Sequence, residues 1–591
     1  MDNWEVAASL ERIAGLLAIK GENPYKVRAY LMASRRINRL EQPLKQLSAE
    51  GRLEEIPGVG KTLAKKIKEL IDTGGSRLLY ALQSEVSPEL LLMYEIPGVG
   101  FKTAHKLYAG LGLKNLKELE VAARDGRIRH LPGLGASLNN RVLEFFKRGL
   151  RHAENFHRGI ALPLARRWVK LLQGLPGVVA CHATGDLRRG RETVTAALLL
   201  VALENRDPGD FKEDLLNIIP TGKLKEKKRG EGNGSPRFTV FSYHTPAGLP
   251  VHLLPVPVEQ MAGALLWSTG SPAHYGQLVS RARRKGLSLT AGTLWAGRAK
   301  LPVSREEDIY DRLGLPFIPP ELREGKGEIE LACRGELPDL LEQGDIQGDL
   351  HLHSNWSDGS HSIPELANRA AAMGYRYLAI TDHSPSLQIA GGLSEERLRE
   401  QMAVIRQFNQ GSTCPCYLFS GMEVDINADG SLDLPDELLD QLELVIASVH
   451  SNFRQGKGEM TRRICRAMAH PAVHIIGHPT GRLLGSRGGY QVDIGQLIAQ
   501  AAATGTVLEI NSSPQRLDLA DIHLPEAKRQ GALLAVNTDA HSLVTMDDME
   551  YGVTVARRGS LEARDVINTR SREELKALLN RIRNNPNKDG R

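Results

Sequence analysis

Short apolar runs alternate with segments of helical spacing in the last part of the chain, from about residue 345. The apolar runs read as buried strands and cover residues 377–381, 417–421, 444–449, 473–476, 507–510 and 533–536. Residues 363–373 and 494–503 have the spacing of amphipathic helices. Strands and helices in this order predict a β/α barrel.

The first 150 residues follow a helical pattern instead, and a short glycine-containing motif recurs in them. Its copies are Ile56-Pro57-Gly58-Val59-Gly60, Ile96-Pro97-Gly98-Val99-Gly100 and Leu131-Pro132-Gly133-Leu134-Gly135. Each copy precedes a run with helical spacing, such as residues 61–70, where Leu63, Ile67 and Leu70 form an apolar face. The repeats predict tight turns between helices, because glycine permits positive φ and close approach of another molecule.

The middle of the chain, residues 151–318, has a different pattern. Strand-like runs occur at 193–202 and 237–243, separated by prolines and glycines. Between them, the basic and glycine-rich run 223–234 predicts a hairpin loop. A solvated turn and a contact to DNA explain this loop equally well.

The composition is that of a multidomain globular protein. At 591 residues, the chain is long enough for about three or four domains, and its net charge of +6 is weak support for a polyanionic partner. No apolar stretch approaches the roughly 20 residues that span a bilayer, and Glu5, Glu11 and Arg12 interrupt the first helical segment, unlike a signal peptide. Five cysteines without a disulfide spacing are typical of free thiols. We therefore expect a cytoplasmic protein without a membrane contact.

Metal-binding residue types stand at or just after the ends of most of the predicted C-terminal strands. The strands of a β/α barrel present their C-terminal ends to one shared site, so these residues are expected to converge. Neutral imidazoles suit transition metals, and a carboxylate can bridge two ions. The residues in question are His351, His353, His383, Glu423, His450, His478, Asp539 and His541. Single histidines are more often core or surface residues, and His361, His470, His474 and His523 are expected to be such.

Two stretches in the middle of the chain point to a known family. Gly185-Asp186-Leu187-Arg188-Arg189-Gly190-Arg191-Glu192-Thr193-Val194 resembles the palm motif of family X DNA polymerases, and Ser268-Thr269-Gly270-Ser271 resembles their nucleotide-binding turn. The repeats at the N-terminus resemble helix-hairpin-helix motifs. With the predicted barrel, essentially the whole chain resembles bacterial family X polymerases that end in a polymerase and histidinol phosphatase (PHP) domain.

The resemblance implies a multidomain α+β and α/β fold. The implied domains are a helical lyase-like unit (1–80), a second helix-hairpin-helix unit (81–150), a nucleotidyltransferase-like palm (151–235), a thumb (236–318), a linker (319–344) and a distorted, TIM-like PHP barrel (345–591). It also implies that the residues above, together with Asp358, bind two or three divalent ions, manganese or zinc, with iron a further candidate. Of these, His351, His353, His383, Glu423, His450, Asp539 and His541 are implied to be catalytic. Such ions activate water for attack on a phosphoester and stabilise the leaving oxygen.

The palm departs from the family pattern. Family X palms hold two Mg²⁺ ions with three aspartates, two of them in a Gly-Asp-x-Asp motif. The matching positions here are Thr195-Ala196-Ala197-Leu198 and, on the later strand, Val251-His252-Leu253. Neither stretch contains a carboxylate, and one imidazole does not replace three oxygen ligands. Templated polymerisation is therefore expected to be lost.

Several further residues are candidates for binding a substrate. The glycines of the repeats (Gly58, Gly60, Gly98, Gly100, Gly133 and Gly135) are implied to contact the DNA backbone, and Arg188 and Arg189 a nucleotide. Arg516 has two interpretations, a clamp on a phosphate or a structural ion pair with Asp518. Lys66 matches the Schiff-base lysine of family X lyase domains, although a solvated lysine face explains it too. Lys457, Arg482 and Arg487 are further candidates for contact with the DNA backbone.

The expected function is that of a monomeric DNA-repair protein that binds gapped, nicked or 3′ DNA ends. Its barrel is expected to act as a metal-dependent 3′–5′ exonuclease, with 3′-phosphate removal and incision at abasic sites as additional activities. Two alternatives stay open. One is a small-molecule phosphatase related to histidinol phosphatase, and the other is a non-catalytic repair scaffold.

Overall fold

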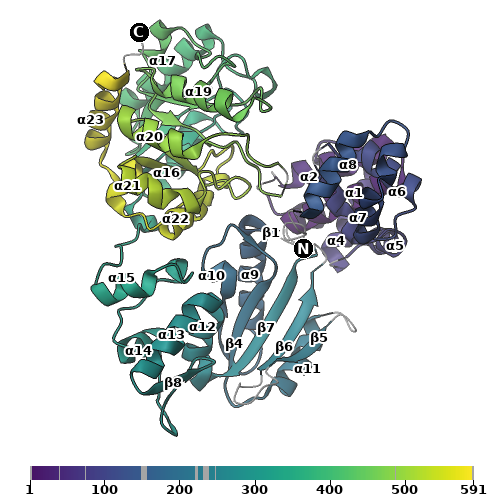
Figure 1. Cartoon of the computed structure of the whole chain (residues 1–591). Helices are drawn as coiled ribbons and strands as arrows, with labels where there is room; N and C mark the ends of the chain where they lie inside the picture. Colours follow the sequence, from purple (N-terminus) through teal and green to yellow (C-terminus); the bar gives the residue numbers. More distant parts are fainter. Residues whose placement is uncertain are drawn as a thin grey trace.

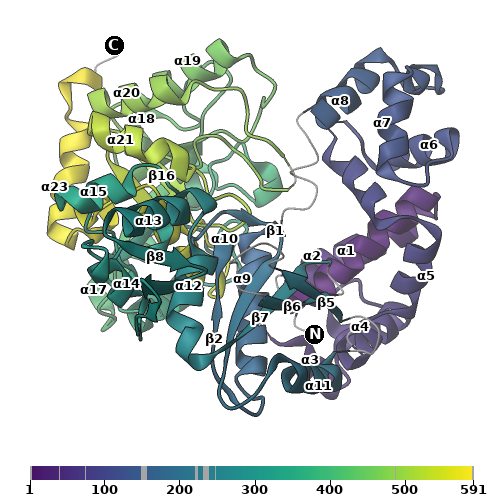
Figure 2. The ribbon, with the colours of Figure 1, turned by 60° about the horizontal axis from the view of Figure 1, so that its bottom comes forward.

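The structure is a computed structural model that describes residues 3–38, 40, 42–73, 75–96, 98–147, 156–219, 224–229, 238–245, 248–485 and 487–588. Figure 1 shows a helical N-terminal unit, a palm and thumb built around a twisted sheet, and a C-terminal barrel. The turned view of Figure 2 shows the barrel packed on the palm and thumb, with the helical unit reaching out beside them. Among the described helices, none is long and apolar enough to cross a membrane.

The N-terminal unit is entirely helical in its described residues. One hydrophobic core runs through it, from Val6 to Val142, so the two predicted units 1–80 and 81–150 are packed together. Figure 1 shows the first helix within this bundle. The α-helices are α1 (Asn3–Lys20), α2 (Pro24–Asn38), α3 (Leu44–Ala49), α4 (Lys61–Thr73), α5 (Arg77–Glu85), α6 (Phe101–Leu111), α7 (Leu116–Arg124) and α8 (Ala136–Lys147).

The palm is a five-stranded sheet in the order β2-β4-β7-β6-β5. Its strands are β2 (Val178–Ala183), β4 (Ala197–Leu203), β5 (Lys225–Arg229), β6 (Phe238–His244) and β7 (Pro250–Pro257), and its helices are α9 (Arg158–Leu172), α10 (Gly185–Arg188) and α11 (Pro208–Ile218). Strands β6 and β7 lie in the segment predicted as thumb, but they complete this sheet, so the palm extends past residue 235. The predicted loop 223–234 also differs, since part of it forms β5, paired with β6; residues 223 and 230–234 are outside the described residues.

The thumb has its own core, which includes Leu266, Leu294, Ile309 and Leu340. Residues 319–344, predicted as a linker, contribute Leu322 and Ile329 to this core and form a helix. They are therefore part of the thumb. The elements are α12 (Met261–Thr269), α13 (Pro272–Arg284), β8 (Leu287–Thr290), β9 (Thr293–Ala296), β10 (Ala299–Lys300), α14 (Glu306–Arg312) and α15 (Glu328–Arg334).

The barrel consists of seven parallel strands in sequential order, as the alternation of strands and helices predicted. A parallel bridge between Leu352 and Ala540 brings its first and last strands together. The strands are β11 (Gly348–Leu352), β12 (Tyr377–Ile380), β13 (Tyr417–Asp425), β14 (Leu444–Ser448), β15 (Ile475–Ile476), β16 (Val507–Asn511) and β17 (Leu534–Asn537). The helices are α16 (Ile363–Ala372), α17 (Glu395–Gly411), α18 (Asp436–Leu439), α19 (Lys457–Met468), α20 (Ile494–Thr504), α21 (Leu524–Gln530), α22 (Met549–Arg558) and α23 (Arg572–Arg583).

Palm and barrel form one continuous hydrophobic core. Around it, Arg166 of α9 makes two hydrogen bonds, of 2.8 and 2.6 Å, to the carboxylate of Glu550 in α22. Arg558 of α22 donates to the carbonyl oxygen of Arg189 and to Glu324. The barrel is thus fixed against the palm by packing and by ion pairs.

Asp548, at the start of α22, is expected to reduce stability at neutral and higher pH. Burial raises the pKa of its carboxyl group from 3.8 to about 8, and Glu550 and Asp547 add repulsion. The folded protein therefore binds this proton more tightly than the unfolded chain, so the free energy of unfolding falls as pH rises from about 4 to about 8. Asp548→Asn should raise the melting temperature by about 2 °C or more at pH 8 and leave it unchanged at pH 4. Asp547→Asn is the comparison: Asp547 is exposed and pairs with Arg369, so the loss of its repulsion on Asp548 should give a smaller gain. An equal gain at pH 8 would contradict the assignment.

Candidate metal centre and DNA-binding surfaces

The C-terminal ends of the barrel strands place the predicted ligands around one centre. His351 lies in β11 and His353 directly after it, while Glu423 lies in β13. His383, His450, His478, Asp539 and His541 follow the ends of β12, β14, β15 and β17. Asp358 comes from the loop after β11. All of the predicted ligands except His478 fall into groups whose ligand atoms lie within 4.8 Å of one another.

Glu423 is at the middle of the centre. Its carboxylate lies 2.9 Å from Nδ1 of His383 and 2.9 Å from Nε2 of His478. It also lies 3.4 Å from Nε2 of His450 and 3.5 Å from Nε2 of His351. One carboxylate in contact with four imidazoles is suited to bridge neighbouring cations, because it reduces the repulsion between them.

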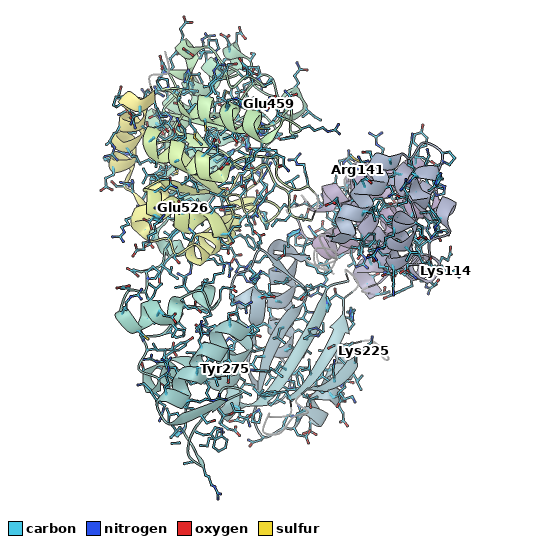
Figure 3. All side chains as sticks on the ribbon, viewed as in Figure 1. Lys114, Arg141, Lys225, Tyr275, Glu459 and Glu526 are labelled. Atoms are coloured by element: carbon cyan, nitrogen blue, oxygen red, sulfur yellow. The ribbon has the colours of Figure 1, made fainter. Side chains whose placement is uncertain are left out.

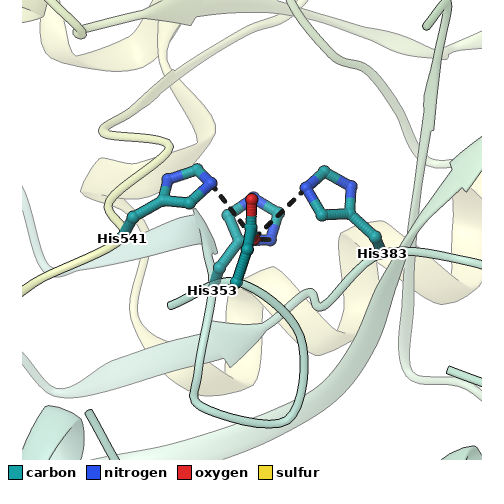
Figure 4. Close-up of side chains that lie close together, drawn as sticks. His353, His383 and His541 are labelled. Carbon is teal, nitrogen blue, oxygen red and sulfur yellow. Dashed lines mark ion pairs between the residues drawn. The ribbon is translucent and has the colours of Figure 1, made fainter. Parts of the chain in front are cut away.

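Two further carboxylates complete the centre on either side of His353. Asp358 lies 3.3 Å from Nε2 of His541 and 3.5 Å from Nε2 of His383, and Figure 4 shows these histidines facing one carboxylate. Asp539 lies 3.1 Å from Nε2 of His353. Asp539 has positive φ (55°), a conformation that few non-glycine residues adopt.

The donor set fits divalent transition-metal ions. Several ligand atoms are buried and make no hydrogen bond, although Nδ1 of His383 and Oε2 of Glu423 lie only 2.9 Å apart. They are Nε2 of His351, Nδ1 of His353 and His383, and Oε2 of Glu423. A buried polar atom without a partner is costly, so the site is built for a group that these atoms would bind. Imidazole and carboxylate together suit manganese, iron or zinc.

The carboxylates also set the charges of the imidazoles before a cation binds. Burial acts to lower the pKa of His450, but Glu423 and Asp425 outweigh it and raise the pKa to about 10. Burial likewise opposes a rise in the pKa of His541, which Asp358 and Asp539 bring to about 9. Cations must displace these protons to bind, so metal affinity is expected to increase with pH.

Three supporting acids were not predicted from the sequence. Glu509 lies 2.7 Å from Nδ1 of His351 and accepts the backbone N–H of His478 at 2.7 Å. Asp425 lies 2.5 Å from Nδ1 of His450. Asp382 accepts hydrogen bonds from Ser354, Ser357 and Gln401, which fixes the loop before Asp358. Asp382 and Asp425 stand within two residues of a ligand, which is a signal in the sequence, whereas Glu509 lies in the middle of β16 and has no such signal. Acids that bind the second nitrogen of metal-binding histidines are common.

Arg516 is directed toward the centre. Its Nε lies 3.4 Å from Oδ2 of Asp539. Asp518, the alternative partner, instead accepts two hydrogen bonds of 2.9 Å from Thr480. Arg516 therefore pairs with Asp539, and its role as a phosphate clamp stays a prediction.

The other cationic side chains that the sequence singled out have partners within the protein. Lys457 pairs with Asp493 at 2.8 Å, and the guanidinium of Arg487 lies 4.3 Å from the ring centre of Phe453. Lys66 lies 3.3 Å from Glu69 in α4, and its lyase role stays a prediction.

The three glycine motifs form similar turns. Gly58, Gly98 and Gly133 have positive φ of 80°, 85° and 73°, which explains why glycine is required there. The second glycine of each motif, Gly60, Gly100 or Gly135, faces open space. Each turn is followed by the N-terminus of a helix, where backbone N–H groups bind anions.

A cation that the sequence did not predict lies beside each turn. Arg36 donates to the carbonyl oxygen of Pro57, and Lys106 donates to that of Pro132 at 3.2 Å. The guanidinium of Arg141 lies against Gly98, and Figure 3 shows Arg141 on the helical unit. The turns thus combine the N-terminus of a helix with a neighbouring positive charge.

In the palm, the predicted nucleotide-binding arginines already have protein partners. Arg188 donates to Thr269 at 2.9 Å and to Glu306 at 2.5 Å. Arg189 donates to the carbonyl oxygen of Thr269 and to Glu324, and it pairs with Asp186. Both hold the palm to the thumb, so binding of a nucleotide would have to compete with these ion pairs.

Comparisons with known proteins agree with this architecture. Family models match residues 1–76 (helix-hairpin-helix domain), 89–148 (SAM-like helix-hairpin-helix tandem), 264–324 (DNA polymerase beta thumb) and 349–513 (PHP domain). Fold and site together define a DNA-polymerase-like protein joined to a PHP barrel.

A relative that matches the whole chain narrows this class of protein to one family. The chain is 37% identical over 587 residues to the DNA polymerase/3'-5' exonuclease PolX of Bacillus subtilis, which covers 98% of the chain and 100% of the relative. The chain therefore belongs to the bacterial family X DNA polymerases with a C-terminal PHP domain.

Two partial relatives match shorter segments. A probable phosphatase of Syntrophotalea carbinolica is 31% identical over 230 residues, 37% of the chain and 90% of the relative. DNA polymerase lambda of Rattus norvegicus is 27% identical over 346 residues, 54% of the chain and 56% of the relative.

Proposed function

We propose that this protein is a cytoplasmic DNA-repair enzyme whose barrel removes nucleotides from 3′ ends of DNA. The observation that supports it most is the set of His, Asp and Glu side chains at the barrel centre, several of whose ligand atoms are buried and make no hydrogen bond. The whole-length relative, named a DNA polymerase/3'-5' exonuclease, gives the substrate class.

The proposed roles follow from the geometry. Glu423, Asp358, Asp539 and the surrounding histidines would hold two or three divalent ions, with manganese preferred. Bound ions would activate water and neutralise charge on the phosphoester. Arg516, next to Asp539, would clamp a non-bridging phosphate oxygen and orient the phosphorus.

The helical unit is proposed to hold the DNA. Its three turns offer helix N-termini and adjacent cations, which bind phosphates without reading bases. Gapped or nicked DNA, which combines duplex with a free 3′ end, fits both the turns and the barrel. We propose that the protein acts as a monomer.

A primer-shortening assay tests the proposed function. Purified protein with Mn²⁺ should shorten a 5′-labelled primer on a template, and Asp539→Ala should abolish the shortening. Asp565→Ala is the matched control, because Asp565 pairs with Lys528 away from the centre. A 3′-phosphorylated primer and a set of phosphorylated metabolites are compared in parallel.

The comparison of DNA with phosphorylated metabolites also decides between the candidate functions. Preference for metabolites over DNA would replace the exonuclease with a small-molecule phosphatase, a possibility that the similarity to probable phosphatases raises. No hydrolysis of any substrate by the metal-loaded protein would favour a scaffold.

A further inference from the structure

The loop that carries Arg516 lies between the metal centre and the palm. It follows β16, and the backbone of Asn511 and Asp518 pairs at its two ends. On the palm side, Pro514 packs against Gly159 so closely that an added Cβ at Gly159 would lie 2.4 Å from Cβ of Pro514. The palm therefore touches the same short loop that directs Arg516 to Asp539.

Arg482 connects this loop to the palm. Its Nε donates to the carbonyl oxygen of Arg516 at 2.9 Å, and its Nη2 donates to that of Leu517. The same Nη2 donates to Oε2 of Glu192, a palm residue, at 2.6 Å. The side chain of Arg482 is only 16% exposed, so these contacts form in a partly desolvated setting where they are stronger than at the surface.

Glu192 is itself fixed within the palm. Its carbonyl oxygen accepts the N–H of Arg158, at the start of α9. Arg482 is further aligned by its neighbour Leu484, whose N–H donates to the carbonyl oxygen of Gln515 at 2.6 Å. A continuous set of contacts thus leads from the palm, through Glu192 and Arg482, to the backbone beside Arg516.

We propose that Glu192 and Arg482 are positioning residues that hold Arg516 in place over the metal centre. The palm would then serve the barrel as a rigid support. This inference rests on the proposed phosphoesterase function and deepens it. Without Glu192, Arg482 loses its charged partner, the loop gains freedom, and Arg516 spends less time in the geometry that binds the phosphate.

Kinetics of full-length variants on the 5′-labelled primer test the inference. Glu192→Gln should lower kcat/KM about tenfold, with the metal content unchanged. Glu550→Gln is the matched control: it removes an ion pair across the same palm–barrel interface, but Glu550 contacts Arg166 and not the Arg516 loop. Its kcat/KM should equal that of the unmodified protein.

A double-variant cycle distinguishes positioning from general destabilisation. If Glu192 acts through Arg516, Glu192→Gln should cause no further loss in an Arg516→Ala background. The inference would be overturned if the losses in kcat/KM from Glu192→Gln and Arg516→Ala multiplied in the double variant. It would also be overturned if Glu192→Gln and Glu550→Gln lost equal activity, or if Glu192→Gln lost none. The proposed function fails separately, if the unmodified protein does not hydrolyse DNA or if Asp539→Ala stays active.

Discussion

Glu423→Gln should abolish hydrolysis of the DNA primer, with a loss of about 1,000-fold or more. The carboxylate contacts imidazoles on several strands, at 2.9 Å for both His383 and His478. The amide keeps the size of the side chain but not its charge, so it cannot bridge two cations. Stabilisation of the transition state by a bound metal amounts to several kcal/mol, and each 1.36 kcal/mol changes the rate tenfold.

Metal analysis and a control separate this effect from misfolding. The Glu423→Gln protein should bind at least one metal ion fewer per chain than the unmodified protein. Its circular dichroism spectrum should be unchanged. Glu443→Gln changes an acid at the opposite end of neighbouring β14, where it pairs with Lys576 and Tyr417. That variant should keep full activity and metal content. An active, fully loaded Glu423→Gln would mean that this carboxylate is not a ligand.

The sequence predicted the barrel and the gathering of its His, Asp and Glu residues because the relevant information is local. A strand and the ligand that follows it lie within a few residues, as in Ile380-Thr381-Asp382-His383, so the periodicity and the residue type appear together. The supporting acids Glu509 and Asp382 were missed because their importance depends on which histidine or loop they face. That pairing forms only when the strands are side by side.

The palm–thumb boundary was placed at residue 235, before β6 and β7, although residues 251–253 were themselves predicted to lie on a palm strand. Strand β7 contains Pro250, Pro255 and Pro257, which argue against an inner strand because proline has no N–H to donate. Its pairing with β6 covers only residues 250–253, so Pro255 and Pro257 lie beyond that ladder. Tertiary packing therefore permits a strand that local propensity disfavours.

Contacts between distant segments could not be predicted either. Glu192 and Arg482 are 290 positions apart; in the sequence Glu192 looks like an ordinary charge, and Arg482 was a candidate for contact with DNA rather than with the palm. Only the packing of α9 and its neighbours on the barrel brings them together. The proposed support of the Arg516 loop is thus a role of the palm that its sequence did not indicate.

The same palm should fail to extend a primer. Ala196, Leu198 and His252 are the positions at which the family pattern expects aspartates. They are partly exposed, whereas Ala197, Val251 and Leu253 are buried. Leu198 and His252 are direct neighbours on the parallel strands β4 and β7, so these side chains share one face of the sheet.

Nothing on that face among these residues can replace three carboxylates. Nδ1 of His252 already lies 2.8 Å from the hydroxyl of Ser242. The two metal ions of a polymerase need oxygen ligands to align the primer hydroxyl and the α-phosphate. We therefore expect the rate of nucleotide addition to be lower than that of a palm with carboxylates by about 1,000-fold or more.

Primer extension in the Glu423→Gln background measures this without interference from shortening. With Mg²⁺ or Mn²⁺ and all four nucleotides, the labelled primer should keep its length. The triple variant Ala196→Asp, Leu198→Asp and His252→Asp, on the same background, should gain extension if the missing ligands are the reason. Extension by the parent would show that the palm is an active polymerase with other ligands. If neither protein extends the primer, restoring the carboxylates is not sufficient, and the ion pairs of Arg188 with Glu306 and of Arg189 with Glu324 are the next obstacle to test.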